Sequence, residues 1–171
     1  EEIMHAVKNS EDKFVCLEAD GKEWIATKSA HEREEFIASK VKSLTADIND
    51  DNDLQKINIQ SLDLPDTIEL SDEQETALNE VMHNQIFLIT GGPGTGKTTM
   101  ITAIALALTQ TKRDVLLCAP TGRAAKRLEE NPGLASFMPK TIHRLLIEIK
   151  SGRIKKIDTL IIDEASMIDV D

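Results

Sequence analysis

The sequence predicts an α/β fold in which a parallel sheet with flanking helices follows a smaller module made of a hairpin and a helix. Two observations carry this prediction. After residue 70, apolar strand-like runs alternate with helical patterns, which is typical of parallel sheets with crossover connections. Before residue 47, an Asp-Gly pair separates two short apolar runs, which indicates a β-hairpin.

The hairpin is predicted over residues 13–28. Its strands are Phe14–Leu17 and Trp24–Thr27, and between them Asp20-Gly21 is a pair that favours a tight turn. Two apolar runs joined in this way are expected to pair as antiparallel strands.

A helix is expected directly after the hairpin. Ser29 and Glu32 have the spacing of a capping box, which predicts a helix running to about Leu44. A hairpin between helices suggests the wing of a winged-helix module, so residues 1–46 are predicted to be the end of a winged-helix-like module. Trp24 is expected in the hairpin core rather than on a base-stacking surface.

The connection to the second module is acidic. Residues 47–53 read Asp-Ile-Asn-Asp-Asp-Asn-Asp, and this turn-prone charge run predicts a linker over residues 47–69. The formal net charge is -10, but residues 1–75 carry 20 acidic and 8 basic side chains, whereas residues 76–171 carry 10 acidic and 12 basic. The second half is therefore mildly basic and can approach phosphates.

The second module is predicted over residues 70–171. Ser71 and Gln74 form another capping box, which starts a helix reaching about His83. Ligands of parallel sheets bind at the carboxyl ends of the strands, so the residues that follow each strand are candidates for function. The later elements are expected as strand Asp114–Ala119, a helix from Thr121, and strand Thr159–Asp163.

The stretch Gly91–Thr98 reads Gly-Gly-Pro-Gly-Thr-Gly-Lys-Thr and fits the phosphate-binding pattern G-x-x-x-x-G-K-[ST] at every fixed position. Ile86–Thr90 before it is predicted as a short buried strand, and Thr98–Leu108 after it as a packed helix. Glycines let backbone N–H groups converge on phosphate oxygens, and the helix adds its positive end. Lys97 is expected to reach the β- and γ-phosphates, and the Thr98 hydroxyl to bind Mg²⁺. The chain is therefore predicted to be a P-loop NTPase.

A pair of carboxylates ends the last predicted strand. Leu160–Ile162 are apolar and Asp163-Glu164 follow them. Strand geometry places Asp163 at the sheet edge beside the phosphate loop, where it is expected to hold Mg²⁺ directly or through water. Glu164 is then placed to polarise the attacking water.

Two further segments follow predicted strands and open helices. Thr121, Gly122 and Arg123 come after strand 114–119, and Thr121 is well placed as an N-cap. The alternative is that its hydroxyl, nearby N–H groups and Arg123 bind a nucleic-acid phosphate. Thr141 and His143 open a further helix and could do the same, although a single histidine is more often structural.

Cysteines and apolar runs bound the environment. Cys16 and Cys118 lie in separate apolar runs without a second Cys or His at metal-ligand spacing, so both are expected to be free core thiols in a reducing, cytoplasmic setting. The longest apolar run, Ile101–Leu108, is too short to span a bilayer, so no membrane partner is expected.

Five blocks, in order, carry a family resemblance: LSDEQETAL, TGGPGTGKTT, APTGRAAKRL, TIHRLL and LIIDEASMID, from residue 70 to 169. Together they resemble the first RecA-like motor domain of superfamily 1 DNA helicases, in particular the RecD-like group, which includes the α subunit of exodeoxyribonuclease V. The residues before 70 resemble, less distinctly, the end of the winged-helix-like region that precedes the motor in stand-alone members.

The resemblance implies a role for each matching residue. Gln74 matches the adenine-reading glutamine, with helix capping as the competing explanation. Asp163 matches the Mg²⁺ carboxylate and Glu164 the catalytic base. The segments that grip single-stranded DNA, or couple that grip to ATP, match Thr121, Gly122, Arg123, Thr141 and His143. The Mg-ATP site matches Gly92, Pro93, Gly94, Thr95, Gly96, Lys97, Thr98 and Thr99.

The family unwinds DNA by moving 5′ to 3′ along one strand, as ATP closes a cleft between two motor domains. The γ-phosphate-sensing glutamine and the second motor domain do not occur in the 171 residues, so the chain is expected to be a fragment that binds ATP and hydrolyses it very slowly. Two rival classes stay open. An AAA+ remodelling ATPase shares the loop but lacks the APTGRAAKRL and TIHRLL blocks, and a nucleotide switch has little need of Glu164.

Overall fold

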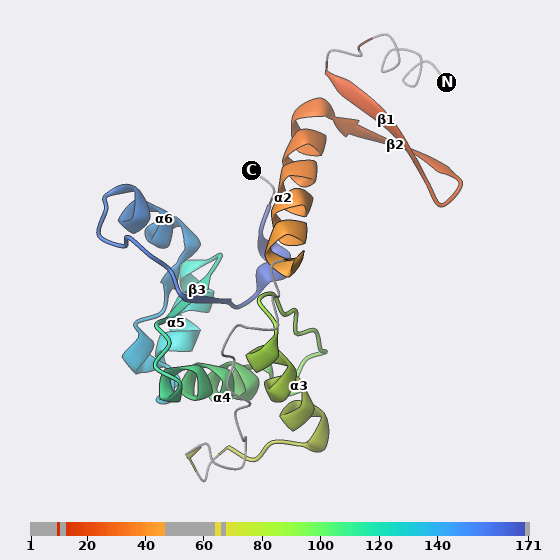
Figure 1. Cartoon of the computed structure of the whole chain (residues 1–171). Helices are drawn as coiled ribbons and strands as arrows, with labels where there is room; N and C mark the ends of the chain where they lie inside the picture. Colours follow the sequence, from red (N-terminus) through yellow and green to blue (C-terminus); the bar gives the residue numbers. More distant parts are fainter. Residues whose placement is uncertain (1–9, 11–12, 47–63, 66–67, 170–171) are drawn as a thin grey trace. The chain divides into compact units, whose positions relative to one another are not determined.

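The computed structural model describes residues 10, 13–46, 64–65 and 68–169 (Figure 1). The contacts divide the chain into two compact units, Glu1–Asn49 with Asp169–Asp171, and Asp50–Ile168. Most of the linker predicted over 47–69 lies outside the described residues, so it stays a prediction, as does the winged-helix identity of residues 1–46.

The first unit contains the hairpin that the sequence predicts. Strands β1 (Phe14–Ala19) and β2 (Lys22–Thr27) pair antiparallel, with Leu17 opposite Trp24. The two turn residues, Asp20 at φ 54° and Gly21 at φ 68°, both take the positive φ that a two-residue hairpin turn of type I′ requires. The Asp-Gly signal therefore identified the turn correctly.

Helix α2 (Lys28–Ala46) follows, but its cap differs from the prediction. The Thr27 hydroxyl accepts a hydrogen bond from the Ala30 N–H at 3.3 Å, so the helix starts before Ser29. Ser29 instead accepts a 2.7 Å hydrogen bond from Arg33 one turn later. The expected core position of Trp24 is also wrong, because its side chain is 55% exposed. A two-stranded hairpin has no second layer of its own to bury such a ring.

The second unit holds a three-stranded parallel sheet in the order β4-β3-β5. The central strand pairs on both sides, with Ala119 opposite Thr141 and Cys118 opposite Ile162. This confirms the predicted α/β class with a parallel sheet and flanking helices. The elements are α3 (Asp72–His83), α4 (Lys97–Gln110), β3 (Val115–Ala119), α5 (Gly122–Glu129), η2 (Ala135–Phe137), β4 (Lys140–Thr141), α6 (Ile142–Lys150), β5 (Thr159–Ile162) and η3 (Ala165–Met167).

Helix α4 is the centre of this unit's core. It is buried on nearly every side, and its residues belong to two apolar clusters. One cluster joins Ile101 and Ala105 to β3 and α5, and the other joins Met100 and Ile104 to α3. The buried Thr102 hydroxyl is satisfied by a 2.9 Å hydrogen bond to the Thr98 carbonyl. The packed helix expected after the phosphate loop is thus present.

One predicted strand is absent. Residues 86–90 form no strand in the structure, and Leu88 is 76% exposed. Only Ile89 packs against the core, at the cluster around α4. An apolar run becomes a strand only where a neighbour accepts its backbone hydrogen bonds, and no strand among the described residues pairs with this one. The sequence also gave no sign of β4, which is two residues long.

Candidate active site

The phosphate loop leads directly into α4. Gly94 and Gly96 take φ values of 77° and 80°, which residues with a Cβ rarely adopt. A Cβ built on Gly92 or Gly94 meets nothing within 4 Å, so the outer face of the loop is open. The first N–H groups of any helix have no partner within it, and here they follow immediately after this open face. The arrangement suits an anion with several oxygens.

Lys97 folds back over the loop that precedes it. Its ammonium donates hydrogen bonds to the carbonyls of Gly91 at 2.8 Å and Gly92 at 2.7 Å. The loop is tightened further by the Thr95 hydroxyl, which donates to the Gly92 carbonyl at 3.0 Å. The one fixed cation of the motif therefore lies against the loop backbone.

Gln74 connects α3 to the same loop. Its side-chain oxygen accepts from the Ser71 N–H at 3.0 Å, and the Ser71 hydroxyl accepts from the Gln74 N–H at 3.3 Å, which confirms the predicted capping box. Its side-chain nitrogen donates to the Thr95 carbonyl at 3.2 Å. A Cβ on Gly96 would come within 2.7 Å of that nitrogen, so only glycine lets helix and loop approach so closely. Capping therefore leaves the Gln74 amide group beside the loop.

The remaining predicted residues of the loop lie around these contacts. Pro93 is exposed in the loop, Thr98 is exposed in the first turn of α4, and Thr99 is half-buried in the same turn. The Thr98 hydroxyl is thus open to solvent beside Lys97, as a ligand for a metal carried by a nucleotide must be.

The predicted carboxylates follow β5. The Asp163 N–H continues the sheet with a 3.0 Å hydrogen bond to the Cys118 carbonyl, and the Asp163 carboxylate accepts from the Glu164 N–H at 2.9 Å. Glu164 has φ 53° and ψ 38°, a left-handed backbone that is uncommon for a residue with a side chain. Such conformations concentrate at functional sites.

Arg127 of α5 is the neighbour of Glu164 that sequence reasoning missed. Its guanidinium lies 3.8 Å from the Glu164 carboxylate, with side chains 65% and 42% exposed. An exposed pair of this length contributes little stability. Its interest is positional, because it joins α5, which begins after Thr121, to the predicted base. No local signal marks this pair, since the two residues are far apart in sequence.

Thr121 and Thr141 both cap helices. The Thr121 hydroxyl accepts from the Ala124 N–H at 3.2 Å and starts α5, while that of Thr141 accepts from the Arg144 N–H at 3.1 Å and starts α6. Because they follow the neighbouring parallel strands β3 and β4, they lie at one edge of the sheet. Gly122, Arg123 and His143 are exposed in the first turns of these helices. The structural role of the two threonines is present, and the proposed contact with nucleic acid is compatible with it.

A charged cluster joins β4 to α6. Glu148 receives Lys140 at 2.8 Å and Arg144 at 2.9 Å, and its side chain is only 14% exposed. The hydrogen bonds from Lys140 and then Arg144 hold the pKa of the Glu148 carboxyl below its ordinary value. Arg144 and Glu148 have the i,i+4 spacing that could have revealed half of this cluster from sequence.

The two cysteines differ, which corrects the expectation that both are core thiols. Cys118 is buried in β3, and burial raises the pKa of its thiol to about 11. Cys16 is exposed on β1, because the hairpin offers it no second layer. The described part of the chain contains no helix long and apolar enough to cross a membrane.

The predicted site residues fall into two groups. Gln74 and the loop residues are in direct contact, and the carboxyl edge of the sheet gathers Thr121, Thr141 and the carboxylate pair. Among the described residues, no hydrogen bond or ion pair joins the loop to Asp163 or Glu164. The reason is that residues 86–90 do not pair with β5, which was the expected connection between them.

The residues present fit Mg²⁺ and a nucleoside triphosphate. The open faces of Gly92 and Gly94 leave room for phosphate oxygens, and Lys97 bonds carbonyls that such oxygens could replace as acceptors. The described residues contain no group of three His, Cys, Asp or Glu side chains that could hold a metal alone. Mg²⁺ bound with substrate phosphates needs only one or two carboxylates, which Asp163 can supply.

Comparison with known proteins covers this same part of the chain. Residues 74–171, more than half of the chain, match the family model of an AAA domain. The ATP-dependent RecD2 DNA helicase of Deinococcus radiodurans is 40% identical over 105 residues, 58% of this chain and 14% of that protein. The RecBCD enzyme subunit RecD of Buchnera aphidicola is 42% identical over 125 residues, 58% of this chain and 21% of the relative. That of Haemophilus influenzae is 34% identical over 135 residues, 62% and 21%. The chain thus spans about a fifth or less of these relatives.

Proposed function

Since this chain belongs to the AAA domain family and groups with the RecD-like helicases, we propose that residues 70–171 are motor domain 1A of an ATP-dependent DNA helicase. The motor moves 5′ to 3′ along single-stranded DNA and serves DNA repair and recombination. The observation that carries the proposal is the open phosphate loop at the start of α4, with Lys97 and Gln74 in contact with its backbone.

Each part of the site has a role in this proposal. Bound Mg-ATP supplies the phosphoryl group to be transferred and the cation that neutralises its charge. Gly92–Thr99 hold the triphosphate, Gln74 reads the adenine, and Thr98 with Asp163 hold Mg²⁺. Glu164 acts as general base for the attacking water.

The DNA strand is proposed to lie at the carboxyl edge of the sheet. The backbone N–H groups at the starts of α5 and α6, with Thr121, Gly122, Arg123, Thr141 and His143, contact its phosphates. The Arg127–Glu164 pair supports coupling between this grip and hydrolysis, because it joins α5 to the base. A shift of α5 on DNA binding would move the partner of Glu164.

The partners and organisation remain proposals. Residues 1–46 are proposed as the end of a winged-helix-like module and 47–69 as an acidic linker, which favours a stand-alone helicase. The relatives named RecBCD enzyme subunit RecD favour the alternative, a subunit of exodeoxyribonuclease V that assembles with other subunits. In either case a second motor domain is needed to supply arginines to the transition state, and such an arginine is worth about 10³–10⁵ in rate.

Glu164→Gln in the full-length protein tests the assignment of the base. The amide cannot accept a proton, so turnover of ATP should fall by about 10²–10⁴. Binding of a fluorescent ATP analogue should be unchanged, because the loop and Lys97 are intact. Glu130→Gln, an exposed change at the end of α5, is the matched control and should retain full turnover. Unchanged turnover in Glu164→Gln would refute the role of Glu164.

A further inference from the structure

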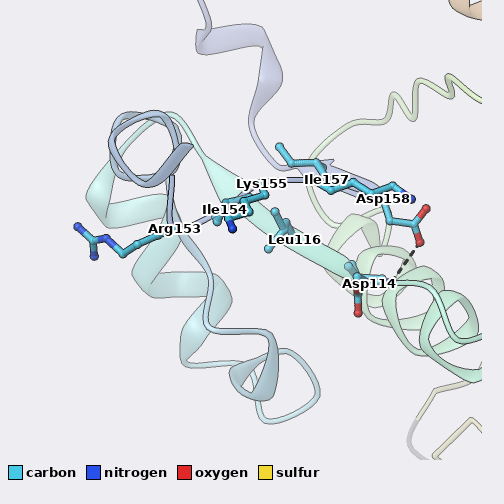
Figure 2. Close-up of a pocket in the computed structure, with 9 residues that line it drawn as sticks. Asp114, Leu116, Arg153, Ile154, Lys155, Ile157 and Asp158 are labelled. Atoms are coloured by element: carbon cyan, nitrogen blue, oxygen red, sulfur yellow. Dashed lines mark hydrogen bonds between the residues drawn. The ribbon is translucent and has the colours of Figure 1, made fainter. Parts of the chain in front are cut away.

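A second charged feature lies at the opposite edge of the sheet from the residues discussed so far. The amino ends of β3 and β5 and the segment before β5 enclose a hollow of about 340 Å³ (Figure 2). Because β3 has five residues at about 3.3 Å each, this edge is about 16 Å from the carboxyl edge. The hollow is lined by Asp114, Val115, Leu116, Arg153, Ile154, Lys155, Lys156, Ile157 and Asp158.

The floor of the hollow is apolar and its rim is charged. Figure 2 shows Leu116 and Ile154 close together, while Arg153 extends away from the strand. The Asp158 carboxylate accepts a hydrogen bond from the Asp114 N–H at 3.2 Å and so ties the starts of the two strands together. This carboxylate is therefore engaged by the backbone of the sheet.

The cations of the rim are not neutralised by ion pairs. Arg153, Lys155 and Lys156 are all exposed, and none of them forms an ion pair with a carboxylate in the part of the chain that the structure describes. The Arg153 guanidinium donates only to the Ser151 hydroxyl, at 3.2 Å. Three further basic residues flank the hollow in sequence, and these are Lys112, Arg113 and Lys150. This edge is thus positive in a chain whose formal net charge is -10.

We propose that Arg153, Lys155 and Lys156 bind phosphates of a nucleic-acid backbone, as a contact separate from that at Thr121 and Thr141. Exposed ammonium groups act as mobile point charges, which suit a row of phosphates rather than one fixed anion. The lining contains no aromatic ring for base stacking and no Asn or Gln for base edges, so the contact reads backbone and not sequence. The inference rests on the proposed function, in which the chain handles DNA.

The test is the salt dependence of binding of the whole 171-residue chain to a fluorescent oligothymidylate. Each lost phosphate contact on a single strand lowers the slope of log K against log salt by about 0.7. Lys155→Gln/Lys156→Gln should therefore reduce the slope by about 1.4, and Lys155→Arg/Lys156→Arg should keep it. Lys22→Gln/Lys42→Gln removes the same charge from exposed positions of the first unit and should leave the slope unchanged.

The outcomes separate this inference from the proposed function. An equal slope in Lys155→Gln/Lys156→Gln and the parent, with binding still weakened by Arg123→Gln, would overturn only the second contact. No binding of oligothymidylate by the parent would overturn both. Displacement of the oligonucleotide from the parent by polyglutamate, as efficient as by unlabelled oligothymidylate, would assign the edge to acidic proteins and overturn the proposal.

Discussion

At the scale of single residues, Gln74 takes part in two contacts that serve different purposes. Its oxygen completes the cap of α3 at Ser71, and its nitrogen holds the Thr95 carbonyl of the loop. The capping explanation and the adenine-reading explanation are therefore separable, because only the first also depends on the Ser71 hydroxyl.

Gln74→Ala and Ser71→Ala in the full-length protein separate the two explanations. A net hydrogen bond is worth about 1 kcal/mol, or roughly fivefold. Gln74→Ala should raise the KM for ATP by about fivefold and reduce the preference for ATP over GTP. Ser71→Ala should lower the melting temperature but leave both kinetic quantities unchanged, as measured by steady-state hydrolysis of the two nucleotides. An equal kinetic effect of both substitutions would mean that Gln74 is only a capping residue.

The cap residues show why single positions were only partly predictable. The capping box at Ser71 and Gln74 is present as predicted, because both partners are local in sequence. The box at Ser29 failed because Thr27, two residues earlier, already caps α2. The contact between Arg127 and Glu164 depends on how β5 and α5 are placed by the sheet, and no local pattern encodes it.

At the scale of elements, the Lys140–Glu148–Arg144 cluster fixes α6 to β4 and so orients the helix that Thr141 begins. Both donors belong to the segment proposed to grip DNA, one before Thr141 and one after it. The cluster therefore couples the stability of this element to the ionisation of one carboxyl.

The pH dependence of stability should report this coupling. Since the pKa of Glu148 in the folded state lies below its ordinary value of 4.5, its contribution to stability is present above pH 4.5. That contribution is lost as the pH falls through the folded pKa. In melts monitored by circular dichroism, Glu148→Gln should lower the melting temperature at pH 7 and show a smaller further loss on acidification than the parent.

Glu129→Gln is the control for this prediction, because Glu129 is exposed on α5 and forms no ion pair among the described residues. It should follow the parent at every pH. Parallel acid-induced losses in Glu148→Gln and the parent would show that Glu148 does not carry the effect.

Elements were predictable from sequence where their signals were local or strongly apolar. Helix α3 ends at the predicted His83, and β3 and β5 lie within the predicted runs. Residues 86–90 have the same apolar character but lack a pairing neighbour, and β4 is too short to leave a pattern. Strand formation is decided by tertiary pairing, which composition alone does not contain.

At the scale of the whole molecule, the chain combines an acidic first half with a mildly basic ATPase half. The site parts known from sequence lie on two elements, the loop with α3 and the carboxyl edge of the sheet. Motor action requires that these parts and a second motor domain act on one nucleotide, so DNA binding and hydrolysis should depend on each other in the full-length protein.

The most direct test of this account is ATP hydrolysis by the full-length protein, measured with and without single-stranded DNA, beside the 171-residue chain alone. The account predicts strong stimulation by DNA in the full-length protein. It predicts nucleotide binding but barely detectable turnover in the 171-residue chain, because the arginines of the second motor domain are missing from it. Hydrolysis indifferent to DNA, or sustained turnover by the 171-residue chain at helicase-like rates, would contradict the account.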